Sequence, residues 1–124
     1  MLIEDNELLP IFMKYLQSDD VGIVNEACWV IANMMSGGSV DIVKHLIHTD
    51  HYIEYFIDAL IRIQDENTGN LMMGALIRCI DVENGLKEVY LEKKLEDILD
   101  NNDHIDKSSA KYSQLLSKLI EFNE

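Results

Sequence analysis

The sequence predicts an all-α protein, a right-handed α-solenoid of about three helical repeats that fill one domain over residues 1–124. Three observations carry this prediction. Apolar residues recur at intervals of three and four, the spacing of one helix face. Proline occurs once, at Pro10, and no long run alternates apolar and polar residues as a half-buried strand would. Similar helix starts return 44 and then 42 residues later.

Six helical segments are marked by their apolar positions, and two shorter helices fit between Gly85 and Asp100. Ser36, Gly37 and Gly38 end the second segment, because glycine stops helices. A helix break is expected at Thr49-Asp50, and residues 65–67 are expected to form a loop. The markers of the six, in chain order, are Leu8–Leu16; Val24–Met35; Val40–Ile47; Ile53–Ile63; Leu71–Ile80; and Ala110–Ile120.

The repeat appears when these segments are aligned with one another. Residues 9–12, 53–56 and 95–98 align as starts of equivalent helices, and residues 30–33, 75–78 and 115–118 align in the helices that follow. A helix-only period of about 40–45 residues indicates a solenoid of armadillo or HEAT type. Three helices per period, the first of them short, favour armadillo repeats, with approximate boundaries at 1–37, 38–84 and 85–124.

Charge and cysteine content limit the classes of partner and the cellular compartment that fit this chain. The chain has 10 Lys+Arg against 23 Asp+Glu, a net charge of −13, which argues against nucleic acid and against an anionic membrane surface. The same charge favours cationic partners. Cys28 and Cys79 lie in apolar runs and are expected to be buried free thiols, which indicates a reducing compartment. The first twenty residues carry no recognisable secretory or mitochondrial signal, and no apolar run has the length of a membrane span.

One helix has a polar face that core packing does not explain. On a helical projection of residues 21–35, an apolar stripe from Val24 to Met35 faces the core, while Glu26, Trp29 and Asn33 fall on the opposite side. Two interpretations stay open. Either a neighbouring helix half-covers the tryptophan, or the face is a peptide platform. An indole attracts a lysine ammonium, an asparagine amide can clamp one peptide unit, and a carboxylate can pair with the lysine.

Residues 25–38 resemble the armadillo signature of the importin-α (karyopherin-α) family, whose third helices carry an E-A-x-W-x-x-x-N pattern. The trailing Ser-Gly-Gly looks like the eighth repeat, Val40–Leu60 is similar to the ninth, and Val89–Phe122 looks like the tenth. The resemblance implies an adaptor of nucleus and cytoplasm that binds basic nuclear localisation signal peptides of cargo proteins. Trp29 would be the wall of a lysine pocket, Asn33 a clamp on the peptide backbone and Glu26 an acid of the minor binding site.

The sequence also departs from the family pattern. In the family, successive repeats present a ladder of Trp and Asn side chains. Here Gly74 stands at the next tryptophan position, and Arg78 and Lys118 stand at the next two asparagine positions, so the later repeats lack this Trp/Asn ladder. Arg78 is expected to repel a cationic ligand locally. The basic importin-β-binding arm of the family is absent, so importin-β is not expected as a direct partner. The chain would be either a C-terminal fragment or a reduced family member, and weak binding of short motifs is expected. The resemblance further implies an export receptor at the last repeat, where Glu92–Asp106 is acidic.

An alternative function is a non-catalytic assembly module, a solenoid end that docks on a protein partner or self-associates. It rests on Leu8, Leu9, Phe12 and Met13, which would lack part of their cover. A histidine cluster of His45, His48 and His51, with Asp50 and Glu54, is interpreted as surface histidines rather than a zinc site. No nucleotide-binding or hydrolase motif is present, so no catalytic residue, metal or cofactor is expected.

Overall fold

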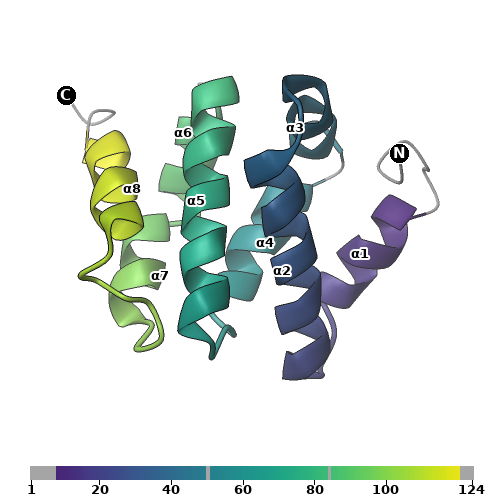
Figure 1. Cartoon of the computed structure of the whole chain (residues 1–124), viewed down its shortest axis with the longest axis horizontal. Helices are drawn as coiled ribbons and strands as arrows, with labels where there is room; N and C mark the ends of the chain where they lie inside the picture. Colours follow the sequence, from purple (N-terminus) through teal and green to yellow (C-terminus); the bar gives the residue numbers. More distant parts are fainter. Residues whose placement is uncertain (1–7, 50, 84, 121–124) are drawn as a thin grey trace.

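The computed structural model describes the backbone over residues 8–49, 51–83 and 85–120, and side chains from residue 11 onward with Lys87 excepted. Within this part of the chain, the ordered secondary structure is helical and no strand occurs. The helices, labelled in Figure 1, are α1 (Leu8–Leu16), α2 (Val21–Gly37), α3 (Val40–Ile47), α4 (Tyr52–Leu60), α5 (Glu66–Val82), α6 (Leu86–Glu92), α7 (Leu95–Asn101) and α8 (Ala110–Ile120).

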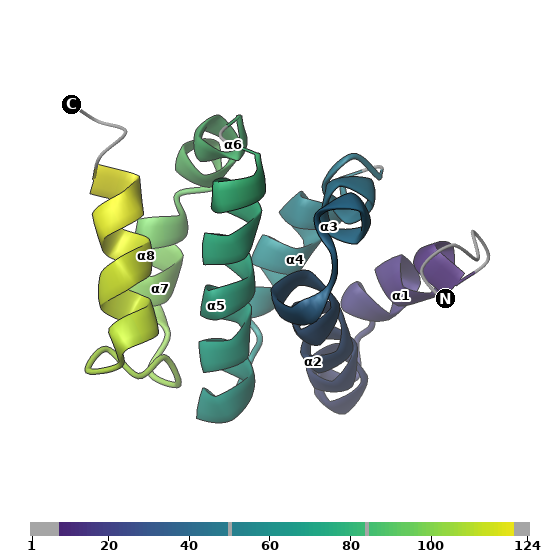
Figure 2. The same cartoon turned by 45° about the horizontal axis from the view of Figure 1, so that its top comes forward.

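The helices form a solenoid of two main layers. Helices α2, α5 and α8 stand side by side in one layer, and α1, α4 and α7 form the layer behind them (Figure 1). The short helices α3 and α6 lie across one edge, each packed on the two helices that follow it. Figure 2 shows α1 at one end of the row and α8 at the other. The chain is therefore an all-α solenoid of about three armadillo-type repeats, as the periodicity predicts.

Short polar side chains set where the helices begin. The carboxylate of Asp20 caps α2 by accepting hydrogen bonds from the backbone N–H groups of Gly22 (2.8 Å) and Ile23 (3.4 Å). The Ser39 hydroxyl caps α3 through the N–H of Ile42 (3.3 Å). Asp65 caps α5 through the N–H of Asn67 (3.0 Å). The expectation that residues 65–67 form a loop is thus wrong for Glu66 and Asn67, which form the first turn of α5.

The apolar stripes meet between the two layers. The stripe predicted on α2 is confirmed, since Val24, Cys28, Ile31 and Met35 are fully buried, although Met34 is only half-buried. Burial of such side chains supplies the main favourable free energy of folding, at about 1.5–3 kcal/mol for each large one. The largest buried side chains include Tyr52, Phe56, Leu60, Met72, Met73 and Tyr90. The core is continuous from Leu16 of α1 to Leu119 of α8.

Polar side chains join each repeat to the one before it. In the rear layer, Arg62 at the end of α4 donates to the carbonyl of Ser18, just beyond α1. The buried Asn102, just beyond α7, donates to the carbonyl oxygens of Leu60 (2.8 Å) and Ile63 (3.3 Å) at the end of α4. The last carbonyls of a helix lack partners within that helix. At the end of α4, a side chain from the following repeat supplies such a partner to the carbonyl of Leu60.

The predicted helices and the break at Thr49-Asp50 are confirmed where the chain is described, except that α4 ends at Leu60 and leaves Ile61 exposed beyond it. None of the helices in the described ranges has both the length and the apolar character needed to cross a bilayer.

Candidate functional site

The solvent side of α2, α5 and α8, which faces the viewer in Figure 1, is called here the α2–α5–α8 face. Helix α2 carries Glu26, Trp29 and Asn33, all three of them exposed, and Glu26 also lines the cleft between α1 and α2. Trp29 has 51% of its surface exposed, although tryptophan residues are on average largely buried. About half of the residue is therefore open to a ligand, and the peptide-platform interpretation stays a prediction.

The amide of Asn33 is occupied only locally. Its Nδ2 donates to the carbonyl oxygen of Trp29 in the same helix at 3.0 Å. This bond leaves one N–H and the amide oxygen free to meet a peptide unit. Glu26 takes part in none of the ion pairs among the described residues. The three predicted site residues thus lie on one exposed helix face, and their polar groups have capacity for a ligand.

The next repeat presents different chemistry on the α2–α5–α8 face. Arg78 of α5 extends back to α2, where Nη1 donates to the carbonyl of Ser36 (3.0 Å) and Nη2 to that of Gly38 (3.1 Å). It thereby caps the carboxyl end of α2, one turn beyond Asn33. Hydrogen bonds to neutral carbonyls leave the guanidinium charge unpaired, so the expected repulsion of a cationic ligand stands as a prediction.

Gly74 lies at the position where the Trp/Asn ladder would have a tryptophan, and the side chain of a lysine from α8 lies over it. A Cβ added at Gly74 would meet Cε of Lys111 at 3.5 Å and its Nζ at 3.8 Å. Lys111 comes from the first turn of α8, so its stem lies over the seam between α5 and α8. Sequence alignment of the repeats gave no sign of this contact, because it joins positions that are not equivalent in the two helices.

In the third repeat, the residue aligned with Asn33 also contacts the preceding repeat. Lys118 of α8 pairs with Asp81 of α5, with Nζ and Oδ1 2.6 Å apart. Both residues line a shallow cleft between the two helices, together with Ile77 and Gln114. At the three positions aligned with asparagine in the ladder, only Asn33 keeps its side chain within its own repeat.

Apolar side chains gather at the α1–α2 end of the solenoid. Ile11, Tyr15 and Ile23 are exposed by 41%, 43% and 41%, and Phe12 and Met13 are half-buried beside them. A cleft of about 320 Å³ lies between α1 and α2. The partial cover predicted for Phe12 and Met13 is confirmed, while the side chains of Leu8 and Leu9 lie outside the described residues.

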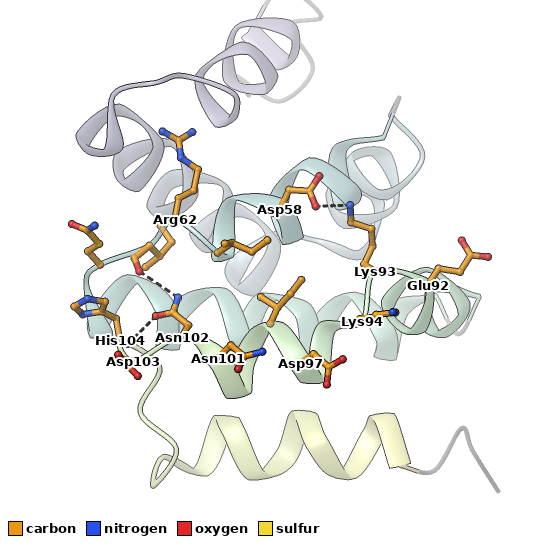
Figure 3. Close-up of a pocket in the computed structure, with 14 residues that line it drawn as sticks. Asp58, Arg62, Glu92, Lys93, Lys94, Asp97, Asn101, Asn102, Asp103 and His104 are labelled. Carbon is orange, nitrogen blue, oxygen red and sulfur yellow. Dashed lines mark hydrogen bonds and ion pairs between the residues drawn. The ribbon is translucent and has the colours of Figure 1, made fainter.

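A larger cleft of about 650 Å³ lies in the rear layer, between α4 and α7 (Figure 3). Its walls carry both signs of charge, and Lys93 pairs there with Asp58. Arg62 and Asn102, which join neighbouring repeats, also line it. Charges of alternating sign around structural side chains give no preference for one class of ligand.

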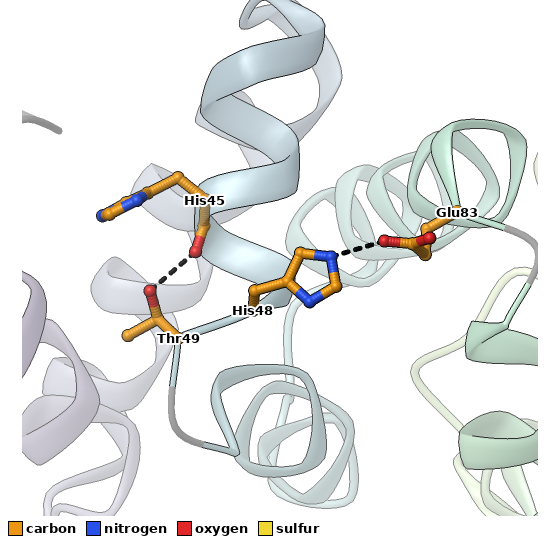
Figure 4. A network of polar contacts seen from close by, with 4 residues as sticks. All are labelled: His45, His48, Thr49 and Glu83. Carbon is orange, nitrogen blue, oxygen red and sulfur yellow. Dashed lines mark hydrogen bonds and ion pairs between the residues drawn. The ribbon is translucent and has the colours of Figure 1, made fainter.

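The side chains of His45, His48 and His51 do not come together at one site. His48 approaches Glu83 (Nε2 to Oε2, 2.5 Å), and its neighbour His45 points away from this pair, contributing only its carbonyl to Thr49 (Figure 4). His51 contacts Glu54 instead, with Nδ1 and Oε2 2.7 Å apart. Asp50 lies outside the described residues. Elsewhere in the chain, as far as it is described, no group of three or more His, Cys, Asp or Glu side chains is placed to hold a metal ion.

Both thiols are free and buried, as predicted. Removal from water disfavours a thiolate, so burial raises the pKa of Cys28 and of Cys79 to about 12 in each case. The charges of Arg62 and Arg78 lower the pKa of Cys28 and Cys79, respectively, but burial is the larger effect. At neutral pH both side chains are neutral core thiols and not nucleophiles.

A helical solenoid of stacked repeats is typical of protein-binding repeat modules, a class that is typically non-catalytic. Residues 2–36 match the family model described as Armadillo/beta-catenin-like repeat, which supports an armadillo-repeat protein. The matched segment contains all of Glu26, Trp29 and Asn33. No curated protein and no solved structure matches the chain.

Proposed function

We propose that the chain is an importin-α-like nuclear import adaptor, or the C-terminal part of one, that binds basic nuclear localisation signals on the exposed face of α2. In this proposal a lysine of the signal lies along the indole of Trp29, with its ammonium toward Glu26. Asn33 turns its amide from the carbonyl of Trp29 to the peptide backbone. Each group contacts a different part of one extended cationic segment.

The exposure of Trp29 beside the Glu26 carboxylate and an Asn33 amide that is bonded only within its own helix is the observation that carries this proposal. A cation over an indole gains about 0.5–2 kcal/mol, most when water is excluded. The net charge of −13 adds a long-range attraction for basic segments. The proposal places the protein in the nucleus and cytoplasm, where cargo carrying such signals is recognised and released, and gives the last repeat an export receptor as a second partner.

Binding by this chain alone is weak in the proposal, because one tryptophan and one asparagine offset little of the entropy of association. The neighbouring positions do not extend the ladder. Gly74 offers no ring, and Arg78 is already bonded to α2 and carries a positive charge.

The test uses the single tryptophan as its reporter. A Lys/Arg-rich signal peptide is titrated at physiological salt against wild type, Asn33→Ala and the control Asn101→Ala, which removes an exposed asparagine from α7. We expect saturable Trp29 fluorescence changes for wild type and the control, with affinity about five- to tenfold weaker for Asn33→Ala if one or two hydrogen bonds are lost. Equal curves for all three proteins, or equal affinity for a scrambled peptide of the same charge, would reject the proposal in favour of nonspecific attraction.

A second candidate function is assembly through the α1–α2 end, which the exposure of Ile11, Tyr15 and Ile23 favours. The occupant in this case is a second copy of the chain. A two-fold contact would place the same patch on both sides, and this patch carries both a positive charge, Lys14, and a negative one, Asp19. Sedimentation equilibrium tests it. Ile23→Lys should abolish a dimer that Asn33→Ala leaves intact, and a wild-type monomer at high concentration would exclude it.

A further inference from the structure

The α2–α5–α8 face changes sign along its length. At its α2 end the charged side chain among the site residues is Glu26, and the aromatic surface is Trp29. Further along the face the charged side chains are Arg78, which reaches from α5 back to α2, Lys111, which lies over α5, and the pair of Lys118 with Asp81 at the α5–α8 seam. Neither Arg78 nor Lys111 belongs to an ion pair among the described residues. In a chain of net charge −13, this is a local excess of positive charge.

We propose that this face selects a bipolar extended peptide, with a Lys or Arg side chain on Trp29 and an Asp or Glu side chain near Lys111 and Arg78. The inference rests on the proposed function and defines the ligand class of that same site. A ligand made only of basic residues would bring like charges together at the α5–α8 seam.

The space beside Gly74 suits a carboxylate better than a lysine. Because Gly74 has no side chain, the last carbons and the ammonium of Lys111 occupy the surface of α5 there, with Nζ 3.8 Å from where a Cβ would stand. No indole is present there to hold a second cation. Gln114 at the same seam adds an amide N–H donor. An ammonium and an amide donor are groups that a carboxylate accepts from.

Helix spacing fixes the separation of the two ligand charges. Packed helices lie about 8–10 Å apart, and an extended peptide advances about 3.3 Å per residue. Trp29 lies on the α2 side of α5, and Lys111 crosses from α8 on the other side. One helix step therefore corresponds to about three residues, so the acidic residue stands about three positions from the lysine.

The experiment compares capped peptides that have one Lys and one Glu three positions apart, in both orders, with the same peptides carrying Gln in place of Glu. Trp29 fluorescence gives the affinities for wild type, Lys111→Glu and Lys44→Glu, the last an exposed lysine on α3 that matches the charge change. We expect the Glu peptide in its preferred order to bind wild type about three- to fivefold more tightly than its Gln counterpart, the size of an exposed ion pair. Lys111→Glu should lose or reverse this preference, and Lys44→Glu should keep it.

Two failures are distinguishable. If basic peptides bind in an Asn33-dependent manner but Glu gives no gain in either order, or if Lys111→Glu keeps the gain, the bipolar preference is wrong and the adaptor proposal survives. If Asn33→Ala changes no affinity for any peptide, the proposed function fails and this inference fails with it. Circular dichroism of each variant checks that the fold is intact.

Discussion

Helices α2 and α5 occupy the same place in successive repeats, but the polar side chains on their open side have different partners. In α2, Asn33 bonds within its own helix and Trp29 is half exposed. In α5, Arg78 bonds across to the carboxyl end of α2. One position of a repeat can therefore serve either a ligand or the neighbouring repeat, depending on the reach of the side chain that it carries.

The largest effect that separates the two helices should be in stability. Arg78→Ala removes two charge-assisted hydrogen bonds and leaves the carbonyls of Ser36 and Gly38 without their partner, so we expect a loss of about 2 kcal/mol in the free energy of unfolding. Asn33→Ala removes one exposed bond in its own helix and should change stability by less than about 0.5 kcal/mol. Urea denaturation of both variants measures this difference. Equal losses would contradict the division of roles.

Their buried sides should behave alike, which alkaline unfolding can show. Cys28 and Cys79 have folded pKa values of about 12 against an unfolded value of 9.0. Between these values the unfolded thiol loses a proton that the folded one keeps. The stability that each buried thiol contributes is therefore present in full below pH 9.0 and is lost as the pH rises toward 12. The limiting slope is about 1.4 kcal/mol per pH unit for each thiol.

Single Cys28→Ala and Cys79→Ala variants provide the check, with urea midpoints measured from pH 8 to 10.5. Each variant should reduce the alkaline slope by a similar amount. The slope should not vanish, because burial also raises the pKa of Tyr52 and Tyr90. A slope that neither variant changes would mean that the thiols are accessible to water in the folded protein.

Sequence reasoning could reach what depends on local periodicity. The spacing of apolar residues predicts the helices, the core stripe of α2 and the outward direction of Trp29, because each depends on residues within one helix. The bonds of Arg78 could not be predicted in this way. Its partner Ser36 is 42 residues away, and the contact exists only once α2 and α5 have packed.

The same reason explains why Lys111 could not be assigned to the candidate site from the sequence. A lysine in a helical first turn resembles an ordinary solvated residue, and only the packing of α8 on α5 places it over Gly74. For Arg78 one signal was available, since the last carbonyls of α2 need partners from outside the regular bonds of that helix. Roles that depend on repeat-to-repeat contact are thus hidden from a pattern read along one helix.

A smaller effect should come from Gly74 itself. Gly74→Ala adds a methyl group that meets Lys111 at ordinary contact distance, and alanine is the better helix former, so we expect a gain of about 0.5–1 kcal/mol. Gly69→Ala in the same helix is the matched control. Its added carbon would lie 3.0 Å from Cδ1 of Ile105, too close for ordinary contact, so it should gain less or lose stability. Thermal unfolding ranks the two, and the opposite ranking would contradict the packing described for α5.

The smallest effect on stability concerns the two side-chain contacts that join repeats on the α2–α5–α8 face, those of Lys118 and Arg78. Lys118→Ala breaks a partly exposed ion pair with Asp81, so it should cost only about 0.5 kcal/mol, because water screens such pairs. That cost should largely vanish in 1 M salt, where the screening length is about 3 Å. The cost of Arg78→Ala should largely persist there, since its partners are neutral carbonyls that need a donor at any ionic strength. If both costs vanished in salt, Arg78 would act through long-range charge and not as the cap of α2.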